Sequence, residues 1–410
     1  MLTEYFRPGV RVFAAGLTGE SAVLREELLL HPQRAAGVEF TSVQLPGVDS
    51  TDYLAIHLES RTRAFFMTPA VRAAMVQGRS ALHPLDYTGI CRYLVEAEPF
   101  DIAVGQFTPP DVAGWCSPGL SADFLPLVWA RANKRVGHFN PELPRLDSSF
   151  RVHVSEFDAV VEAATPALAV KPSAPSTVIE SIGRHAANLF RDGDTLQFGL
   201  GSVLPEVARA LHGHRRLRVL SGMVSPWLQT LWESGSLDRD AQIVTGVVFG
   251  DASFYDYVGR LDRVRLEDVR STHAVHSISQ IPRFVAVNSA VEVDLFGQMN
   301  SERSDGSLQA GAGGLPAFAH AAQIAPQGRL LICLPATARG GKLSRIVSSL
   351  DSNSLCTVPR HQADAIVTEF GVAELRGLPV ERRAEALIAI AHPDHRERLS
   401  AAWDEMGKRL

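Results

Sequence analysis

The stretch FVAVNSAVEVDLFGQMNS, residues 284–301, combines the pattern of a β-strand with polar residues that a buried strand does not need. Its alternating valines predict one buried strand over 286–297, with the valines on one face. Asn288, Glu292 and Asp294 project from the other face. Since ionised groups are costly to desolvate, that face must meet solvent, a partner or a substrate.

A similar stretch occurs in the first half of the chain. FDIAVGQFTPPDVAGWCS (100–117) is also an apolar strand that ends in Asp-x-x-Gly, and VRVFAAGLTGES (10–21) resembles DTLQFGLGSVLPEV (194–207) in the same way. Both pairs have nearly the same offset along the chain, which predicts duplication of one α/β unit. Asp294 is then expected to form a turn, as Asp111 does in the first copy.

The order of strand-like and helix-like runs indicates an α/β fold with mainly parallel sheets flanked by helices. The stretch ALAVKPSAPSTVIES (167–181) is the best linker, so we expect two tandem domains, residues 1–172 and 173–410. In such sheets ligands bind at the carboxyl ends of the strands, where the glycine turns lie.

Composition narrows the class of function. A net charge of -5 and a pI near 6.3 argue against general binding of nucleic acids or membrane surfaces. The four cysteines are far apart and form neither a zinc motif nor a disulfide framework. The spacing of the cysteines therefore predicts no metal site. The first residues lack the apolar core of a signal peptide, so we also expect a cytoplasmic protein.

Two glycine-rich stretches could hold a ligand oxygen with backbone amides. Gly199 and Gly201 follow a predicted strand and precede a predicted helix. A tight strand-to-helix connection is the favoured interpretation of this pair, and the third glycine of the dinucleotide fingerprint is missing. Gly311, Gly313 and Gly314 make the backbone approachable, either for an oxyanion or as a flexible turn.

Charged residues supply the remaining candidates. Lys342 and Arg345 lie in ATARGGKLSRIV (336–347), which could hold phosphate groups or could be a solvated loop. The histidines, His273 included, show no metal-ligand spacing and are expected to be structural. Because no Gly-x-Ser-x-Gly elbow is present, nucleophilic chemistry falls most naturally to a carboxylate. Glu292, before a glycine turn, is the candidate, although buried acids more often complete a salt bridge.

Together these motifs resemble the acetyl-CoA hydrolase/transferase group of class I CoA-transferases, which includes 4-hydroxybutyrate CoA-transferases. The resemblance covers nearly the whole chain. The matching segments, in the family's order, are TPPDVAGWCSPG (108–119), VNSAVEVDLFGQMNSE (287–302), GAGG (311–314), LPATARGGKLSRIV (334–347) and VPRHQADAIVTEFGVAELRG (358–377).

The resemblance implies an enzyme with two CoA-transferase-like domains and the active site between them. It implies that Glu292 is the nucleophile, which exchanges CoA between a short-chain acyl-CoA, such as acetyl-CoA, and a small carboxylic acid through a glutamyl-CoA thioester. A homo-oligomer is also implied. A thioesterase on the same residues and a non-catalytic CoA-binding homologue are the alternatives.

Other roles follow by analogy only. The resemblance implies that the five glycines named above hold the oxyanion or the CoA tail and that the two basic residues meet the CoA phosphates. Asn288 and Glu369 would support the site.

The chain departs from the family in two places. Leu315-Pro316-Ala317 replaces a segment that usually carries Gln and Asp, and VLSGMVSPWLQ (219–229) stands where a His-Thr-Glu segment is usual. Both changes are expected near the acyl and CoA pocket.

Overall fold

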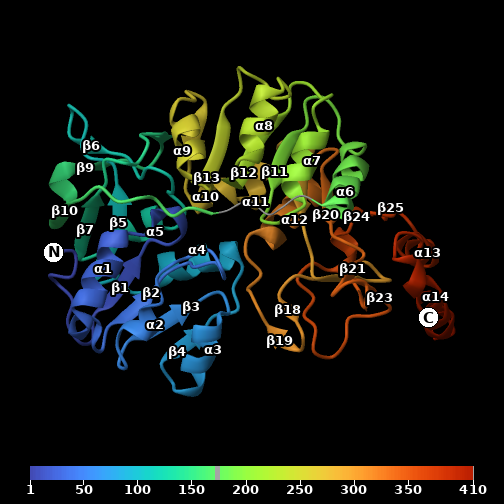
Figure 1. Ribbon diagram of the computed structural model, residues 1–410, viewed down its shortest axis with the longest axis horizontal. Helices are drawn as coiled ribbons and strands as arrows, with labels where there is room; N and C mark the ends of the chain where they lie inside the picture. The colour runs from blue at the N-terminus through green and yellow to red at the C-terminus, as the bar shows by residue number, and fades with distance from the viewer. Residues whose placement is uncertain (171–175, 410) are drawn as a thin grey trace.

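The structure is a computed structural model that describes residues 1–170 and 176–409, and it contains two large sheets, one in each half of the chain (Figure 1). All neighbouring strands of the seven-stranded first sheet are parallel, in the order β10-β7-β5-β1-β2-β3-β4. Its strands are β1 (Arg11–Ala14), β2 (Glu39–Thr41), β3 (Arg61–Ala64), β4 (Ser80–Leu82), β5 (Ile102–Phe107), β7 (Lys134–Phe139) and β10 (Ala159–Glu162).

The nine-stranded second sheet has the order β25-β24-β20-β15-β11-β12-β13-β14-β8 and is parallel except for β25. Its strands are β8 (Asp147–Ser148), β11 (Thr195–Phe198), β12 (Arg218–Val224), β13 (Ile243–Val248), β14 (Val264–Leu266), β15 (Phe284–Asn288), β20 (Arg329–Cys333), β24 (Ala365–Thr368) and β25 (Gly371–Glu374).

Short strands lie outside these two sheets, and α-helices cover the faces of the sheets. The short strands are β6 (Trp115–Cys116), β9 (Val152–His153), β16 (Glu292–Asp294), β17 (Met299–Asn300), β18 (Arg303–Ser304), β19 (Ser307–Leu308), β21 (Thr337–Ala338), β22 (Leu343–Ser344) and β23 (Ile346–Val347). The α-helices are α1 (Ala22–Leu30), α2 (Tyr53–Ile56), α3 (Pro69–Val76), α4 (Tyr87–Glu96), α5 (Leu125–Trp129), α6 (Thr177–Ala187), α7 (Leu204–Ala210), α8 (Trp227–Glu233), α9 (Ala252–Gly259), α10 (Val269–Thr272), α11 (Val275–Ile278), α12 (Leu315–Ile324), α13 (Val380–Ala389) and α14 (Pro393–Gly407).

The two sheets repeat one topology, as the sequence predicts. The order β10-β7-β5-β1-β2-β3-β4 corresponds, strand for strand, to β24-β20-β15-β11-β12-β13-β14. The paired sequence segments fall on β1 and β11, and on β5 and β15, which hold equivalent central places. The mainly parallel α/β fold is therefore confirmed.

The Asp-x-x-Gly turns are also equivalent. The Asp111 carboxylate accepts hydrogen bonds from the backbone amides two and four residues later, and the Asp294 carboxylate does the same. Gly114 and Gly297 close the turns with φ angles of 83° and 90°, which favour glycine. Asp294 is thus a turn-former, matched by Asp111.

The prediction of one strand over 286–297 is wrong. β15 ends at Asn288 in the large sheet, and β16 begins at Glu292 in a separate sheet with β17 and β23. The chain leaves the large sheet at residues 289–291, so the alternation on either side belongs to two different sheets.

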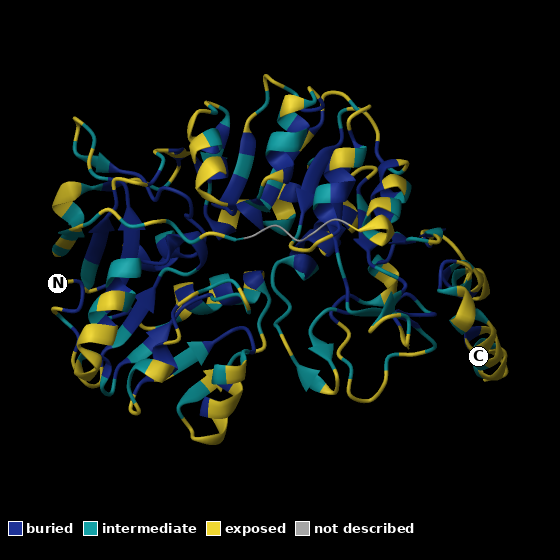
Figure 2. Ribbon diagram, in the orientation of Figure 1, coloured by how far each residue is buried: buried dark blue, intermediate teal, exposed yellow. Residues whose placement is uncertain are grey.

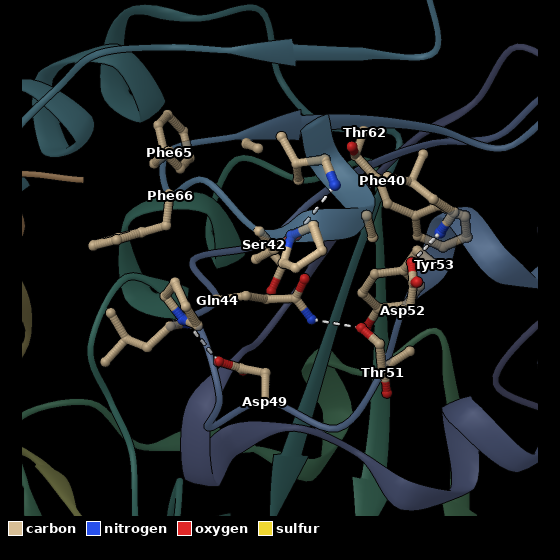
Figure 3. A pocket seen from close by; sticks show the side chains of 18 of the residues that line it. Phe40, Ser42, Gln44, Asp49, Thr51, Asp52, Tyr53, Thr62, Phe65 and Phe66 are labelled. Carbon is tan, nitrogen blue, oxygen red and sulfur yellow. Dashed lines mark hydrogen bonds between the residues drawn. The ribbon is translucent and has the colours of Figure 1, made fainter. Parts of the chain in front are cut away.

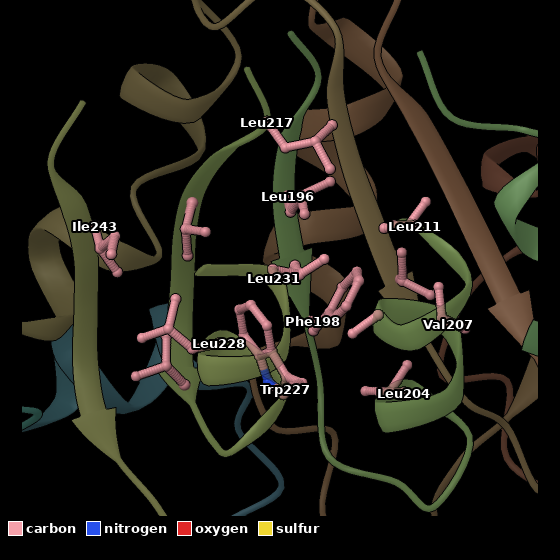
Figure 4. Packing of buried hydrophobic residues seen from close by; sticks show 14 of the residues in the cluster. Leu196, Phe198, Leu204, Val207, Leu211, Leu217, Trp227, Leu228, Leu231 and Ile243 are labelled. Carbon is pink, nitrogen blue, oxygen red and sulfur yellow. The ribbon is translucent and has the colours of Figure 1, made fainter. Parts of the chain in front are cut away.

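The second sheet is packed on both faces. Leu196 and Phe198 of β11 face α7 and α8, where Phe198 and Trp227 have ring centroids 4.8 Å apart (Figure 4). Phe284 and Ala286 of β15 face the opposite layer, which contains α12. Burial of each large apolar side chain contributes about 1.5–3 kcal/mol. Figure 2 shows the result, buried strands beneath helices that are exposed on their outer sides.

The halves meet along backbone bridges. Strand β8, from the first half, pairs with β14 at the edge of the second sheet. Isolated bridges join Ser121 to Val247, Asp123 to Asp268 and Asp86 to Gly313. The predicted boundary between residues 172 and 173 lies outside the described residues. None of the helices in the described ranges is long and apolar enough to cross a membrane.

Candidate active site

A cavity of about 220 Å³ lies where the two halves meet. The first half contributes Leu17, Leu45, Tyr87 and Asp123, and the second half contributes the remaining walls. Part of the second half's contribution comes from the carboxyl ends of β11, β12 and β15. The prediction that the ligand site lies at the carboxyl ends of the strands therefore agrees with the position of this cavity.

Two amide side chains lie at those strand ends. The Asn288 Nδ2 group donates to Gln197 Oε1 at 2.9 Å, and both side chains line the cavity. Gly199 follows β11, and a Cβ on this residue would lie 2.2 Å from Asn288 Oδ1. The backbone amide of Gly199 already donates to the Val287 carbonyl at 2.9 Å. Gly199 thus makes room for Asn288, and its amide is committed to the strand ladder.

The N-terminus of α12 also faces the cavity. Gly313, Gly314 and Leu315 line it; the Gly313 amide takes part in the bridge to Asp86, whereas the amides of Gly314 and Leu315 bond no acceptor within the described residues. The Gly313 carbonyl accepts from the Tyr87 amide at 3.0 Å, which ties the loop to the first half. Free amides at the positive end of a ten-residue helix can hold a carboxylate or a developing oxyanion.

His273 fills the floor of the cavity between two glycines. A Cβ on Gly222 would lie 2.6 Å from the imidazole, and one on Gly314 would lie 2.4 Å from it. The ring packs against Tyr87 and Phe318, with centroids 4.7 and 4.6 Å away. Burial lowers the pKa of His273 to about 3, so the imidazole is neutral at physiological pH.

Asp123 is the carboxylate that lines the cavity within the described part of the chain. It is 8% exposed. Burial raises its pKa to about 8, and the nearby Asp49 and Asp268 act in the same direction. The carboxyl group is therefore mostly protonated at neutral pH and can donate a hydrogen bond.

Glu292 does not line this cavity. Its Oε1 atom accepts from Asn300 Nδ2 at 2.8 Å and from Ser354 Oγ at 2.6 Å. Strand β16 carries it in the small sheet, beyond the turn at 289–291. Its neighbours Ser289 and Ser301 do reach the cavity, so the carboxylate lies next to the site.

The other predicted residues are more dispersed. Gly201 is exposed, and Gly311 packs against the first half, where a Cβ would lie 2.4 Å from the Phe65 carbonyl. Lys342 is exposed near the β21–β22 hairpin. Of the predicted glycines, only Gly199, Gly313 and Gly314 line the cavity.

Arg345 and Glu369 lie beside the site. Arg345 donates Nη1 to the Ala290 carbonyl at 3.4 Å, and burial lowers its pKa. Glu369 accepts from the Ala336 amide at 2.8 Å, and its charge favours the protonated form of Arg345. Arg345 thus contacts the turn before Glu292, Glu369 contacts the loop after β20, and neither residue lines the cavity.

Both departures from the family fall on the cavity. Leu315 lines it and Ala317 is buried beneath the start of α12. The 219–229 stretch forms the end of β12 and places Gly222 and Met223 in the cavity wall. Both changed segments therefore contribute residues to the wall of this cavity or lie directly beside it.

A second cavity, of about 380 Å³, lies in the first half (Figure 3). Phe40, Tyr53 and Phe65 are among its aromatic lining residues, and Asp49 lies on its polar side. Leu45 lines both cavities and thus forms part of the wall between them.

Four residues that line the cavity are not predicted as site residues from the sequence: Asp123, Gln197, Gly222 and His273. Asp123 comes from the other half of the chain, and no spacing motif connects it to residues after 195. His273 follows the short helix α10 and was expected to be structural. Only the position of Gln197 at a strand end beside a glycine turn could have indicated a site residue.

Comparison with known proteins identifies the class. A crystal structure of RipA from Yersinia pestis has a TM-score of 0.90 at 24% identity, and it covers 99% of this chain and 96% of its own. A 4-hydroxybutyrate CoA-transferase from Porphyromonas gingivalis has a TM-score of 0.81 at 26% identity, with coverage of 100% and 96%. The fold is that of the CoA-transferases.

Sequence comparison gives the family. The profile of the acetyl-CoA hydrolase/transferase C-terminal domain matches residues 250–403. The 4-hydroxybutyrate coenzyme A transferase of Clostridium kluyveri is 32% identical over 396 residues, which are 95% of this chain and 92% of that protein. The chain belongs to the acetyl-CoA hydrolase/transferase family, and its enzyme class is CoA-transferase.

Proposed function

We propose that the chain transfers CoA between a short-chain acyl-CoA and a small carboxylic acid. The observation that carries this proposal is the cavity between the two repeated halves, which is lined by the N-terminus of α12 at Gly314 and by the polar strand ends at Gln197 and Asn288. This arrangement suits a thioester carbonyl that develops negative charge. Its support from outside the structure is the similarity to a 4-hydroxybutyrate coenzyme A transferase over nearly the whole chain.

Glu292 is the proposed nucleophile. Its carboxylate attacks the thioester, which gives a mixed anhydride and CoA thiolate. The thiolate then attacks the glutamyl carbonyl, the acyl carboxylate leaves, and an incoming acid reverses the steps. This assignment requires the carboxylate to leave Asn300 and Ser354 and turn toward Ser289, because it bonds those two side chains and does not line the cavity. The family resemblance of the strand that carries Glu292 supports the assignment.

The remaining assignments follow the same reasoning. Asn288 positions the thioester carbonyl, and Gly313 and Gly314 hold the oxyanion. Lys342 and Arg345 meet the CoA phosphates, which would reconcile an acidic protein with a polyanionic substrate. We further propose two domains divided near residue 172, a homo-oligomer, and a cytoplasmic location consistent with free cysteines at four positions.

A panel of donors and acceptors tests this function. Purified protein is incubated with one acyl-CoA and one carboxylic acid, and the CoA esters are identified by mass spectrometry. Formation of a new ester, lost in Glu292→Gln, supports the proposal. A protein that forms no new ester across a broad panel contradicts it.

A hydrolase or a non-catalytic CoA-ester-binding protein is the second candidate. One observation favours it: the carboxyl that lines the cavity, Asp123, is mostly protonated at neutral pH, and Glu292 lies outside. A hydrolase would consume acyl-CoA without an acid acceptor. A binding protein would bind acyl-CoA in a calorimeter without consuming it.

A further inference from the structure

We propose that the cavity accepts uncharged acyl groups and excludes acyl groups that carry a second carboxylate. This inference rests on the proposed function, since it assumes that the acyl part of a thioester enters the cavity. The substrate class is then acyl-CoA esters of monocarboxylic acids, and esters of dicarboxylic acids are discriminated against.

The first observation is the absence of cationic side chains. No lysine or arginine lines the cavity within residues 1–170 and 176–409. Arg345 is near, but its Nη1 atom donates to the Ala290 carbonyl and the residue does not line the cavity. A second carboxylate would therefore lose its water without gaining a counter-charge.

The second observation is that the polar groups present are neutral. His273 sits on the cavity floor with a pKa of about 3, so it cannot become a cation near neutral pH. Its Nδ1 atom lies 2.9 Å from Thr272 Oγ1, whose hydroxyl bonds the Asp268 carbonyl. Nδ1 therefore donates to Thr272 Oγ1, which fixes the orientation of the ring, and burial keeps the ring neutral.

The third observation concerns the charges that surround the cavity. Asp123 lines it, and Asp49 and Asp268 lie close enough to raise the pKa of Asp123. The burial and the neighbouring acids that keep the Asp123 carboxyl protonated would disfavour an additional ionised carboxylate in the same way. The Gly314 and Leu315 amides, which we assign to the reacting carbonyl, are not available to a distant second carboxylate.

The fourth observation is the apolar remainder of the wall. Met223, Phe318 and Leu315 line the cavity beside Leu45 and Val247. Contacts with these side chains stabilise a methylene or methyl group and give nothing to an ionised one. Leu315 stands where the family usually carries a polar residue, so the apolar wall is a feature of this chain.

The test compares butyryl-CoA, succinyl-CoA and free CoA in a calorimeter, with the full chain at one ionic strength. We expect butyryl-CoA to bind at least about tenfold more tightly than succinyl-CoA, which is ~1.4 kcal/mol. Equal binding of the two esters overturns the inference. Butyryl-CoA that binds no better than free CoA also overturns it, because the acyl group then lies elsewhere.

A variant tests the cause. Met223 is partly exposed and lines the cavity one residue before the end of β12, so Met223→Lys places a cation in the cavity wall, and Met223→Gln is the matched uncharged control. We expect Met223→Lys, and not Met223→Gln, to improve succinyl-CoA binding relative to butyryl-CoA. An unchanged ratio in a folded Met223→Lys protein contradicts the inference. If that variant does not fold, the wild-type comparison still decides.

The outcome separates this inference from the proposed function. Exchange that proceeds equally with both esters preserves the transferase and rejects the charge discrimination. Absence of binding by any CoA ester rejects both.

Discussion

The contact between Gly222 and His273 makes a quantitative prediction. A Cβ on Gly222 would lie 2.6 Å from Cε1 and 2.8 Å from Nε2 of the imidazole, closer than atoms can pack. The ring cannot simply retreat, because Gly314 lies against its edge and Tyr87 and Phe318 pack on it. We therefore expect Gly222→Ala to lower the free energy of unfolding by about 1–3 kcal/mol, the usual cost of overpacking.

Urea denaturation followed by circular dichroism measures this effect. Gly213→Ala is the matched control, because Gly213 is exposed and a Cβ there meets nothing within 4 Å. His273→Ala provides the double-mutant cycle: removal of the ring should relieve the clash, so the two changes together cost less than their sum by about 0.5–3 kcal/mol. Strictly additive effects, or a Gly222→Ala protein as stable as the Gly213→Ala control, would refute the reasoning.

Three further predictions concern the acids and the cavity wall. Because burial raises the pKa of Asp123 to about 8, the folded protein keeps a proton that the unfolded chain releases above about pH 4. This difference in bound protons should make the free energy of unfolding fall as the pH rises from about 4 to 8, by up to ~1.4 kcal/mol per pH unit. Asp123→Asn should remove this part of the pH dependence, measured by urea titrations at a series of pH values. Parallel pH profiles for the variant and the wild-type protein would contradict this. Asp294→Ala should lower the free energy of unfolding by about 1.5–3 kcal/mol in the same assay, because the carboxylate is fully buried. Asp111→Ala, in the equivalent but more exposed turn, should lower it by less. Equal losses of stability in the two variants would count against the argument. Leu45→Ala should join the two cavities and make room for a longer acyl chain. We expect calorimetry to show that the affinity for hexanoyl-CoA, relative to that for butyryl-CoA, improves by roughly tenfold. An unchanged ratio would show that Leu45 does not separate the cavities.

The sequence could predict the duplicated fold because the repeat lies in local patterns. Each Asp-x-x-Gly turn is closed by amides two and four residues away, so the signal at Asp111 and at Asp294 is contained in a few residues. The repeat then implies that the two sheets share one strand order, and the structure supplies that order. The break at residues 289–291 was not predictable, because the same alternation continues on both sides and only the tertiary pairing of β16 distinguishes them.

The cavity was less accessible to sequence reasoning for a physical reason. Gly313, Gly314 and Asn288 belong to recognisable motifs at strand ends or helix starts, and they do line it. Asp123 and His273 reach it only because the halves pack together. The pKa values of both groups depend on burial, which no spacing along the chain reveals.

The nucleophile remains the sharpest question, since Glu292 lies beside the cavity and bonds Asn300 and Ser354. The direct measurement is peptide mass spectrometry after incubation with an acyl-CoA and no acceptor acid. We predict an adduct of CoA mass on the peptide that contains Glu292, absent from Glu292→Gln. An unmodified peptide in the wild-type protein, or an adduct that persists in Glu292→Gln, would contradict covalent transfer through this carboxylate.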